Sequence, residues 1–166
     1  METWMWVLLG QIVLGFVIIV GITGIFGAVA PRVPNERFSH DGWLGRVRPW
    51  ETPRRYRRIG AQWLVGVMPD AGETMGGTTK SRLPEAADGG VDRYLIEVRR
   101  AEWVHTWSMI SWIPLWPIAL VWPSFTVSAI VNTAIAILVN LPFMIVVRYN
   151  HVRIDVLQRR RQRQAP

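Results

Sequence analysis

The sequence contains no cysteine and only three histidines among its 166 residues. The lack of cysteine excludes disulfide bonds, thiolate catalysis and cysteine-ligated metal sites. His40, His105 and His151 are far apart in the sequence, and none belongs to a metal-binding spacing such as HExxH. We therefore predict neither a metal site nor a cysteine-dependent activity.

Charge is absent from a long N-terminal run, Trp4 to Ala30, whose only polar side chains are Gln11 and Thr23. About 20 apolar residues are enough to cross the hydrocarbon core of a bilayer, so we predict a first transmembrane helix at 4–30. A cleaved signal peptide is the alternative, because the run ends in Ala28-Val29-Ala30. A retained membrane helix is favoured over a cleaved signal peptide for three reasons. No basic residue precedes the run, the run is too long for the apolar region of a signal peptide, and Pro31 would directly follow the cleavage site.

Two more apolar runs follow in the C-terminal half of the chain. Residues 125–147 carry no charge and are predicted to form the last span. Residues 103–122 are long enough for a middle span, but Pro114 and Pro117 leave a re-entrant or broken helix as an open alternative. The short turn at Pro123 and Ser124 predicts an antiparallel hairpin of the two runs.

Glycine and proline predict two local features of these spans. Gly21, Gly24 and Gly27 recur at helical spacing and would permit a close helix contact. Pro142, near the end of the last run, is expected to kink its helix and to free a backbone carbonyl.

Basic residues lie at one side of the predicted spans. They follow the first run, precede the middle run and follow the last run, while the N-terminal residues and the turn after Trp122 have none. Basic residues near span ends mark the cytoplasmic side. We therefore predict an all-α, multi-pass protein of a bacterial cell membrane, 1–166 as one membrane domain, with three spans, an external N-terminus and a basic cytoplasmic tail at 148–166.

The segment 31–102 is predicted to be cytoplasmic. Ile59, Trp63, Leu64 and Val67 recur at helical spacing just after four arginines, which predicts an amphipathic helix in the membrane interface. Arginine mixed with aromatic residues is also found in nucleic-acid-binding proteins, but a segment joined to the bilayer at both ends favours lipid, and we expect no nucleic-acid partner. Residues 69–90 are predicted to form a loop and 94–102 a helix.

A polar cluster at the start of the middle run carries the first candidate site residues. Glu102 and His105 are three residues apart, which places them on one helix face. A carboxylate beside an imidazole fixes its tautomer and raises its basicity, as a general base requires. A structural histidine at the end of a span is the equal alternative.

A second cluster lies at the end of the last run and includes Asn140, Arg148, Asn150 and Arg153. In the hairpin, this cluster ends on the same side as Glu102 and His105, so the two groups are expected to face each other. A buried arginine is suited to bind a carboxylate or a phosphate. The alternative is an interfacial anchor that reaches to lipid headgroups.

The motif Arg-Ala-Glu-x-x-His at 100–105, together with Asn140-x-Pro142 and Arg148-Tyr-Asn-x-x-Arg153, resembles the glycosyl-4,4'-diaponeurosporenoate acyltransferase family. Further segments resemble the same family in the same order along most of the chain: Arg32-Val-Pro34, Trp50-Glu51, Tyr56, Trp63 and Met68-Pro-Asp-Ala-Gly72. The sequence departs from the family in its richness in arginine and tryptophan and in its loop around 73–90, which leaves the acceptor open.

The resemblance implies transfer of a fatty acyl group to a sugar hydroxyl of a glycosylated carotenoid or a related lipid, with acyl-CoA or an acyl carrier as co-substrate and no other cofactor. His105 would then be the general base and Glu102 would orient it. Substrate binding would fall to the remaining matched polar residues, Arg100, Asn140, Arg148, Asn150 and Arg153. The alternative is a non-catalytic membrane subunit or lipid-binding scaffold in which the Glu-His-Arg cluster is structural.

Overall fold

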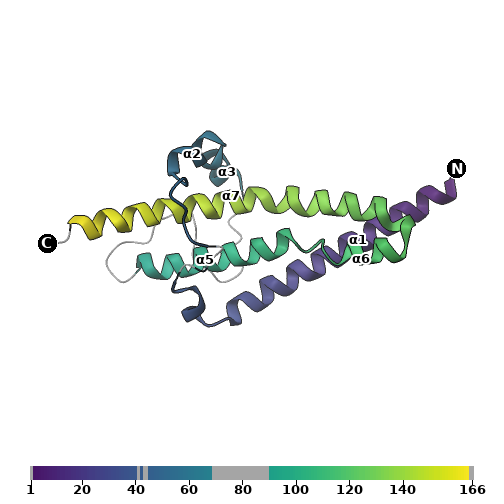
Figure 1. Cartoon of the computed structure of the whole chain (residues 1–166), viewed down its shortest axis with the longest axis horizontal. Helices are drawn as coiled ribbons and strands as arrows, with labels where there is room; N and C mark the ends of the chain where they lie inside the picture. Colours follow the sequence, from purple (N-terminus) through teal and green to yellow (C-terminus); the bar gives the residue numbers. More distant parts are fainter. Residues whose placement is uncertain (1, 41, 43–44, 69–89, 165–166) are drawn as a thin grey trace. The chain divides into compact units, whose positions relative to one another are not determined.

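The computed structural model describes residues 2–40, 42, 45–68 and 90–164, and its elements there are all helical, as predicted. Figure 1 shows them along the chain. They are α1 (Glu2–Val29), η1 (Ala30–Arg32), η2 (Asn35–Phe38), α2 (Pro53–Arg58), α3 (Ala61–Val67), α5 (Gly90–Met109), α6 (Leu115–Val121), η4 (Pro123–Phe125) and α7 (Thr126–Gln164). The loop predicted at 69–90 lies, apart from Gly90, outside the described residues.

The chain divides into two compact units. Unit 1 contains residues 1–32 and 104–141, and unit 2 contains residues 33–103 and 142–166. The two boundaries fall within α5 and α7, and the second boundary coincides with Pro142, through which α7 continues as helix.

Two helices in the described residues are long and apolar enough to cross a membrane, Thr3–Arg32 and Pro123–Arg160. Most of the large apolar side chains of α1 are exposed, among them Trp6, Val17 and Ile25. Exposed apolar surface of this extent is unfavourable in water. These features suggest membrane association, and the count of three spans with an external N-terminus stays a prediction.

The predicted middle span, 103–122, is not one helix. Helix α5 ends at Met109, the chain turns at 110–114, and the short helix α6 begins at Leu115. The prolines explain the break, because Pro114 and Pro117 lack the amide N–H groups that would continue the ladder of hydrogen bonds. The broken helix left open by the sequence is therefore the observed arrangement, and α5 also contains the helix predicted at 94–102.

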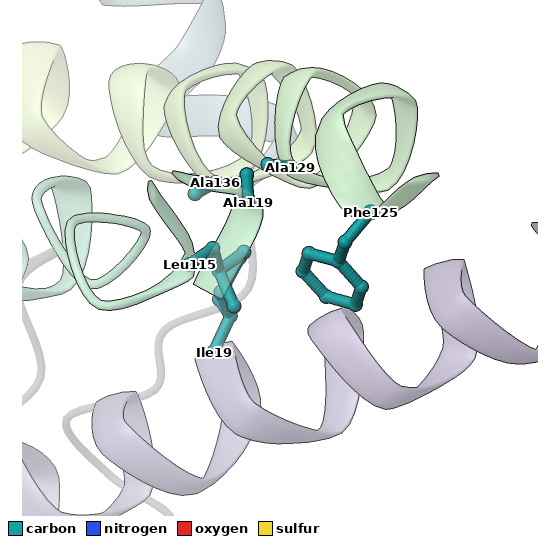
Figure 2. Packing of buried hydrophobic residues seen from close by; sticks show 6 residues of the cluster. All are labelled: Ile19, Leu115, Ala119, Phe125, Ala129 and Ala136. Atoms are coloured by element: carbon teal, nitrogen blue, oxygen red, sulfur yellow. The ribbon is translucent and has the colours of Figure 1, made fainter. Parts of the chain in front are cut away.

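Unit 1 is packed by small and aromatic side chains. In Figure 2, Ile19 of α1 and Leu115 of α6 point toward one another, with Phe125 beside them. The cluster is completed by three alanines, Ala119, Ala129 and Ala136. Small side chains let helices approach closely, which is how helices associate where lipid removes the hydrophobic driving force.

The close approach of α1 to α7 is at Gly15, not at the predicted glycines. A Cβ atom on Gly15 would lie 2.4 Å from Asn132 Nδ2, whereas one on Gly21, Gly24 or Gly27 would meet no described atom within 4 Å. Helical spacing identifies a face of small residues, but it does not say whether a partner covers that face. The prediction of a contact at Gly21, Gly24 and Gly27 is therefore not met in the described part of the chain.

The amphipathic segment of unit 2 forms two helices rather than one. Thr52 caps α2 by accepting a hydrogen bond from the Arg55 amide at 3.3 Å. Gly60 follows α2 with a positive φ of 84°, a conformation that glycine adopts without steric cost. This left-handed residue ends α2 and lets α3 begin at Ala61.

Candidate functional site

Arg148 of α7 is the centre of a polar cluster in unit 2, which we call the arginine cluster: Arg148, Glu51, Tyr56, Glu102 and His151. Its Nε and Nη2 atoms donate to the two carboxylate oxygens of Glu51, at 2.7 and 2.5 Å. This bidentate pairing is the strongest geometry for an arginine and a carboxylate.

The other donors of Arg148 are also used. Nη1 donates to the Gly45 carbonyl at 2.5 Å and to Glu102 Oε1 at 3.2 Å, and Nη2 donates to the Arg46 carbonyl at 2.7 Å. A guanidinium has five N–H donors, and here each has a protein acceptor. Arg148 therefore holds the backbone at 45–46 and the carboxylates of Glu51 and Glu102 to α7, and it keeps no N–H for a substrate in this state.

Glu51 is positioned by a turn and by Tyr56. Its Oε2 accepts from the Arg48 amide at 2.7 Å, and its Oε1 accepts from the Tyr56 hydroxyl at 2.6 Å. Burial alone raises the pKa of Glu51, but the hydrogen bonds from Arg148, Tyr56 and the Arg48 amide outweigh it and lower the pKa from 4.5 to about 2. For Tyr56, burial and the bond to the Glu51 carboxylate raise the pKa. The cluster therefore holds an ionised Glu51 beside a neutral tyrosine.

Glu102 of α5 links Arg148 to His151 within the arginine cluster. Its Oε1 lies 2.9 Å from Nδ1 of His151, and the two residues are 5% and 1% exposed. An ionised carboxylate can only accept a hydrogen bond, so Nδ1 of His151 donates to it where Glu102 is ionised. The pair is buried within unit 2, where solvent does not reach the ring.

The predicted site residues are distributed over both units. Glu102 and Arg148 are in contact, as the hairpin predicted. Arg100 donates to Glu97 and to Asn35, and its guanidinium lies 5.2 Å from the centre of the Phe38 ring. All of these residues belong to unit 2.

Asn150 and Arg153 also lie in unit 2, and both keep unused donors. Asn150 is buried, and its Nδ2 has no hydrogen-bond partner among the described residues. The guanidinium of Arg153 lies 5.3 Å from the Tyr149 ring centre, and it makes no hydrogen bond or ion pair with the part of the chain described. These two side chains are thus better placed than Arg148 to bind a ligand.

His105 and Asn140 belong to unit 1. His105 is half-buried on α5, three residues after Glu102. Asn140 is buried and donates to the Ala136 carbonyl at 2.9 Å, within its own helix. The catalytic role of His105 and the substrate-binding role of Asn140 stay predictions.

Three members of the arginine cluster were not predicted as site residues: Glu51, Tyr56 and His151. His151 follows Arg148 by three residues in α7, so both lie on one helix face, and that spacing is visible in the sequence. Glu51 is joined to Arg148 across 97 residues, a distance that no local pattern reveals. Among the residues described, no group of three or more acidic or histidine side chains is arranged to hold a metal ion.

A family model, that of the glycosyl-4,4'-diaponeurosporenoate acyltransferases, matches residues 40–160. The match covers well over half of the chain and includes every member of the arginine cluster, together with His105. Comparison with curated proteins and with solved structures finds no match. The extent of the family match is decisive, and the chain belongs to the glycosyl-4,4'-diaponeurosporenoate acyltransferase family.

Proposed function

We propose that the protein is a multi-pass membrane enzyme of the bacterial cell membrane that transfers a fatty acyl group to a sugar hydroxyl of a glycosylated carotenoid or a related lipid. The observation that carries the proposal is the family match over residues 40–160. The two long apolar helices support action at a membrane, where such an acceptor is dissolved.

The proposed reaction needs a base at the acceptor hydroxyl. His105 takes the hydroxyl proton as the sugar oxygen attacks the acyl carbonyl, the tetrahedral oxyanion then collapses, and the thiolate of the donor leaves with a proton. Of the two histidines within α5 and α7, His105 is half-buried and His151 is 1% exposed. A base must reach its substrate within hydrogen-bond distance, which favours His105.

The charged end of the donor needs a partner other than Arg148, whose N–H groups are all used. Arg153 has a guanidinium with no hydrogen bond to described residues, which suits a phosphate of coenzyme A or of a carrier protein. Asn150 has a buried Nδ2 without an acceptor among the described residues. We assign this unused amide to the binding of a polar group of the donor within unit 2.

The arginine cluster has a supporting role in this proposal. It joins Glu51, in the connection before α2, to Glu102 of α5 and His151 of α7 through buried hydrogen bonds. Catalytic groups must be held within a fraction of an ångström of their working geometry. The cluster thereby fixes α5 at Glu102, within unit 2.

The test is acyl transfer by the purified chain in lipid vesicles. Radiolabelled acyl-CoA is supplied with a glycosylated C30 carotenoid acid and, as the matched control, with the same carotenoid acid lacking the sugar. We expect label in the glycosylated acceptor alone. Label in both acceptors would contradict attack by a sugar hydroxyl, and label in neither, with acyl-CoA or with acyl carrier protein, would contradict transfer to a glycosylated carotenoid.

The saturation of Arg148 favours one alternative, a non-catalytic membrane scaffold. All five of its N–H groups are used within the chain, as in a purely structural cluster. A scaffold would transfer no label from any donor, whereas it would still bind the acceptor lipid. Binding of the glycosylated carotenoid without turnover would therefore identify the scaffold.

A further inference from the structure

The end of α2 and helix α3 expose large apolar side chains. Ile59, Trp63 and Val67 are 58%, 67% and 59% exposed. Trp63 and Val67 are four residues apart and share one face of α3, whereas Ile59 is the residue that ends α2, just before the left-handed Gly60. Within α3 only Ala61 is buried, so the core of unit 2 does not cover this face.

Helix α2 exposes a matching group of positive charge. Arg54, Arg55, Arg57 and Arg58 are all exposed, and α2 carries no acidic residue. None of the four side chains forms an ion pair with the described part of the chain. Four unpaired guanidinium groups on six residues make a concentrated cationic surface.

The orientation of α2 is set from its opposite side. At about 100° per residue, the four arginines fall within an arc of roughly 160°, and Tyr56 lies on the remaining side. The Tyr56 hydroxyl donates to Glu51 of the arginine cluster at 2.6 Å. Tyr56 thus ties α2 to unit 2 and leaves the arginines outward, while the left-handed Gly60 sets the course of α3.

We propose that α2 and α3 form a docking surface for the anionic face of a lipid bilayer. The arginines of α2 bind headgroup phosphates, and Ile59, Trp63 and Val67 enter the region between headgroups and acyl chains. Cationic residues beside tryptophan and aliphatic residues are typical of segments that lie in this interface. The inference concerns membrane contact and is independent of the proposed acyl transfer.

The arginines of α2 and the apolar side chains beside them together favour a lipid bilayer as the partner. Nucleic acid would bind the arginines but would leave three large aliphatic and aromatic side chains in water. A bilayer with anionic lipid offers phosphate to the arginines and hydrocarbon to the apolar side chains at adjacent depths. The same chain contains two helices long and apolar enough to cross such a bilayer.

The absence of cysteine makes a depth measurement direct, because one introduced cysteine is the only labelling site. Val67→Cys carries a nitroxide on the proposed lipid face, and Gln62→Cys is the matched control on the exposed side of α3 away from Trp63. Both full-length variants are reconstituted in phosphatidylcholine vesicles with and without phosphatidylglycerol. Power-saturation EPR then compares collisions with oxygen, which concentrates in lipid, and with a water-soluble nickel chelate.

With phosphatidylglycerol present, we expect the label at 67 to collide mainly with oxygen and the label at 62 mainly with the nickel chelate. Replacement of all four arginines by glutamine should lower the lipid-inserted fraction at 67 by roughly tenfold or more, because each arginine contributes to binding at an anionic surface. Added salt should act in the same direction. The replacement should have little effect in vesicles of phosphatidylcholine alone.

Three results would overturn the proposal. Equal nickel collision at 62 and 67 would show a water-exposed face. Exclusion of both reagents at 67, with spin–spin broadening that dilution by unlabelled protein removes, would identify a second copy of the chain as the occupant. Exclusion of both reagents only after addition of an acidic carrier protein or of DNA would identify that macromolecule instead.

Discussion

The two units of this protein differ in their buried polar contacts. In unit 1, two fully buried neutral side chains donate to backbone carbonyls, Ser128 to Gln11 at 2.7 Å and Asn132 to Ile12 at 3.1 Å. In unit 2 the buried polar contacts include charged groups, with Arg148 between two carboxylates. Neutral polar groups are inexpensive to bury beside a carbonyl, whereas a buried charge requires a complete set of partners.

The length of α7 explains why one helix can serve both units. At 39 residues it is about 58 Å long, and residues 126–147 alone cover the roughly 30 Å of a hydrocarbon core. If this part crosses the bilayer, Arg148 and His151 lie beyond it. The apolar part of α7 thus suits lipid, and the charged part from Arg148 onward suits water or headgroups.

The largest expected effect comes from breaking the arginine cluster. Arg148→Met leaves Glu51 and Glu102 buried without a counter-charge, and removal of one partner of a buried ion pair costs about 3–5 kcal/mol. We expect a large drop in the thermal melting temperature in detergent. The matched control is Arg159→Met, because Arg159 is 62% exposed in its pair with Asp155 and such pairs contribute less than about 1 kcal/mol. Equal melting of the two variants would contradict the importance of the cluster.

Acidification should weaken the same cluster, with a smaller loss of stability than Arg148→Met causes. The pKa of Glu51 is lowered to about 2 in the folded chain, so the unfolded state binds more protons and stability falls as the pH drops from about 4.5 toward 2. Glu51→Gln should flatten this part of the curve of stability against pH, measured by thermal melts. Glu36→Gln, at an exposed position, is the control and should follow the wild type; a slope unchanged in Glu51→Gln would refute the assignment.

A smaller effect is expected from the contact between α1 and α7 in unit 1. Gly15→Ala places a methyl group against Asn132 Nδ2, and overpacking of this kind costs about 1–3 kcal/mol. Gly21→Ala, at a position with no described atom within 4 Å of an added Cβ, should melt like the wild type. The double variant Gly15→Ala with Asn132→Ala removes the clash, so it should lose less than the sum of its single variants. Additive losses would show that the two residues are not in contact.

The sequence predicted what local patterns determine. The long apolar runs identified α1 and the first part of α7, and the prolines at 114 and 117 marked the place where the middle run breaks. The contact between Glu102 and Arg148 followed from the hairpin. Local periodicity could not reveal the break at Gly60, because an arginine-rich and an apolar stretch at helical spacing are equally compatible with one helix or two.

Other features required the tertiary structure. The pairing of Glu102 with His151 joins residues 49 apart, and that of Arg148 with Glu51 joins residues 97 apart. The contact of α1 with α7 also depends on which face of α1 meets a neighbour. It lies at Gly15, not at the predicted Gly21, Gly24 and Gly27. Pairing across long loops is set by the assembled helices rather than by any single segment.

The measurement that tests the account most directly compares the three histidines in the acyl-transfer assay, with a thermal melt for each variant. We expect His105→Ala to lose transfer while it melts like the wild type, and the control His40→Ala, at an exposed position, to keep both. His151→Ala should lower the melting temperature, because it removes the buried partner of Glu102. Transfer retained by His105→Ala would contradict its role as the general base.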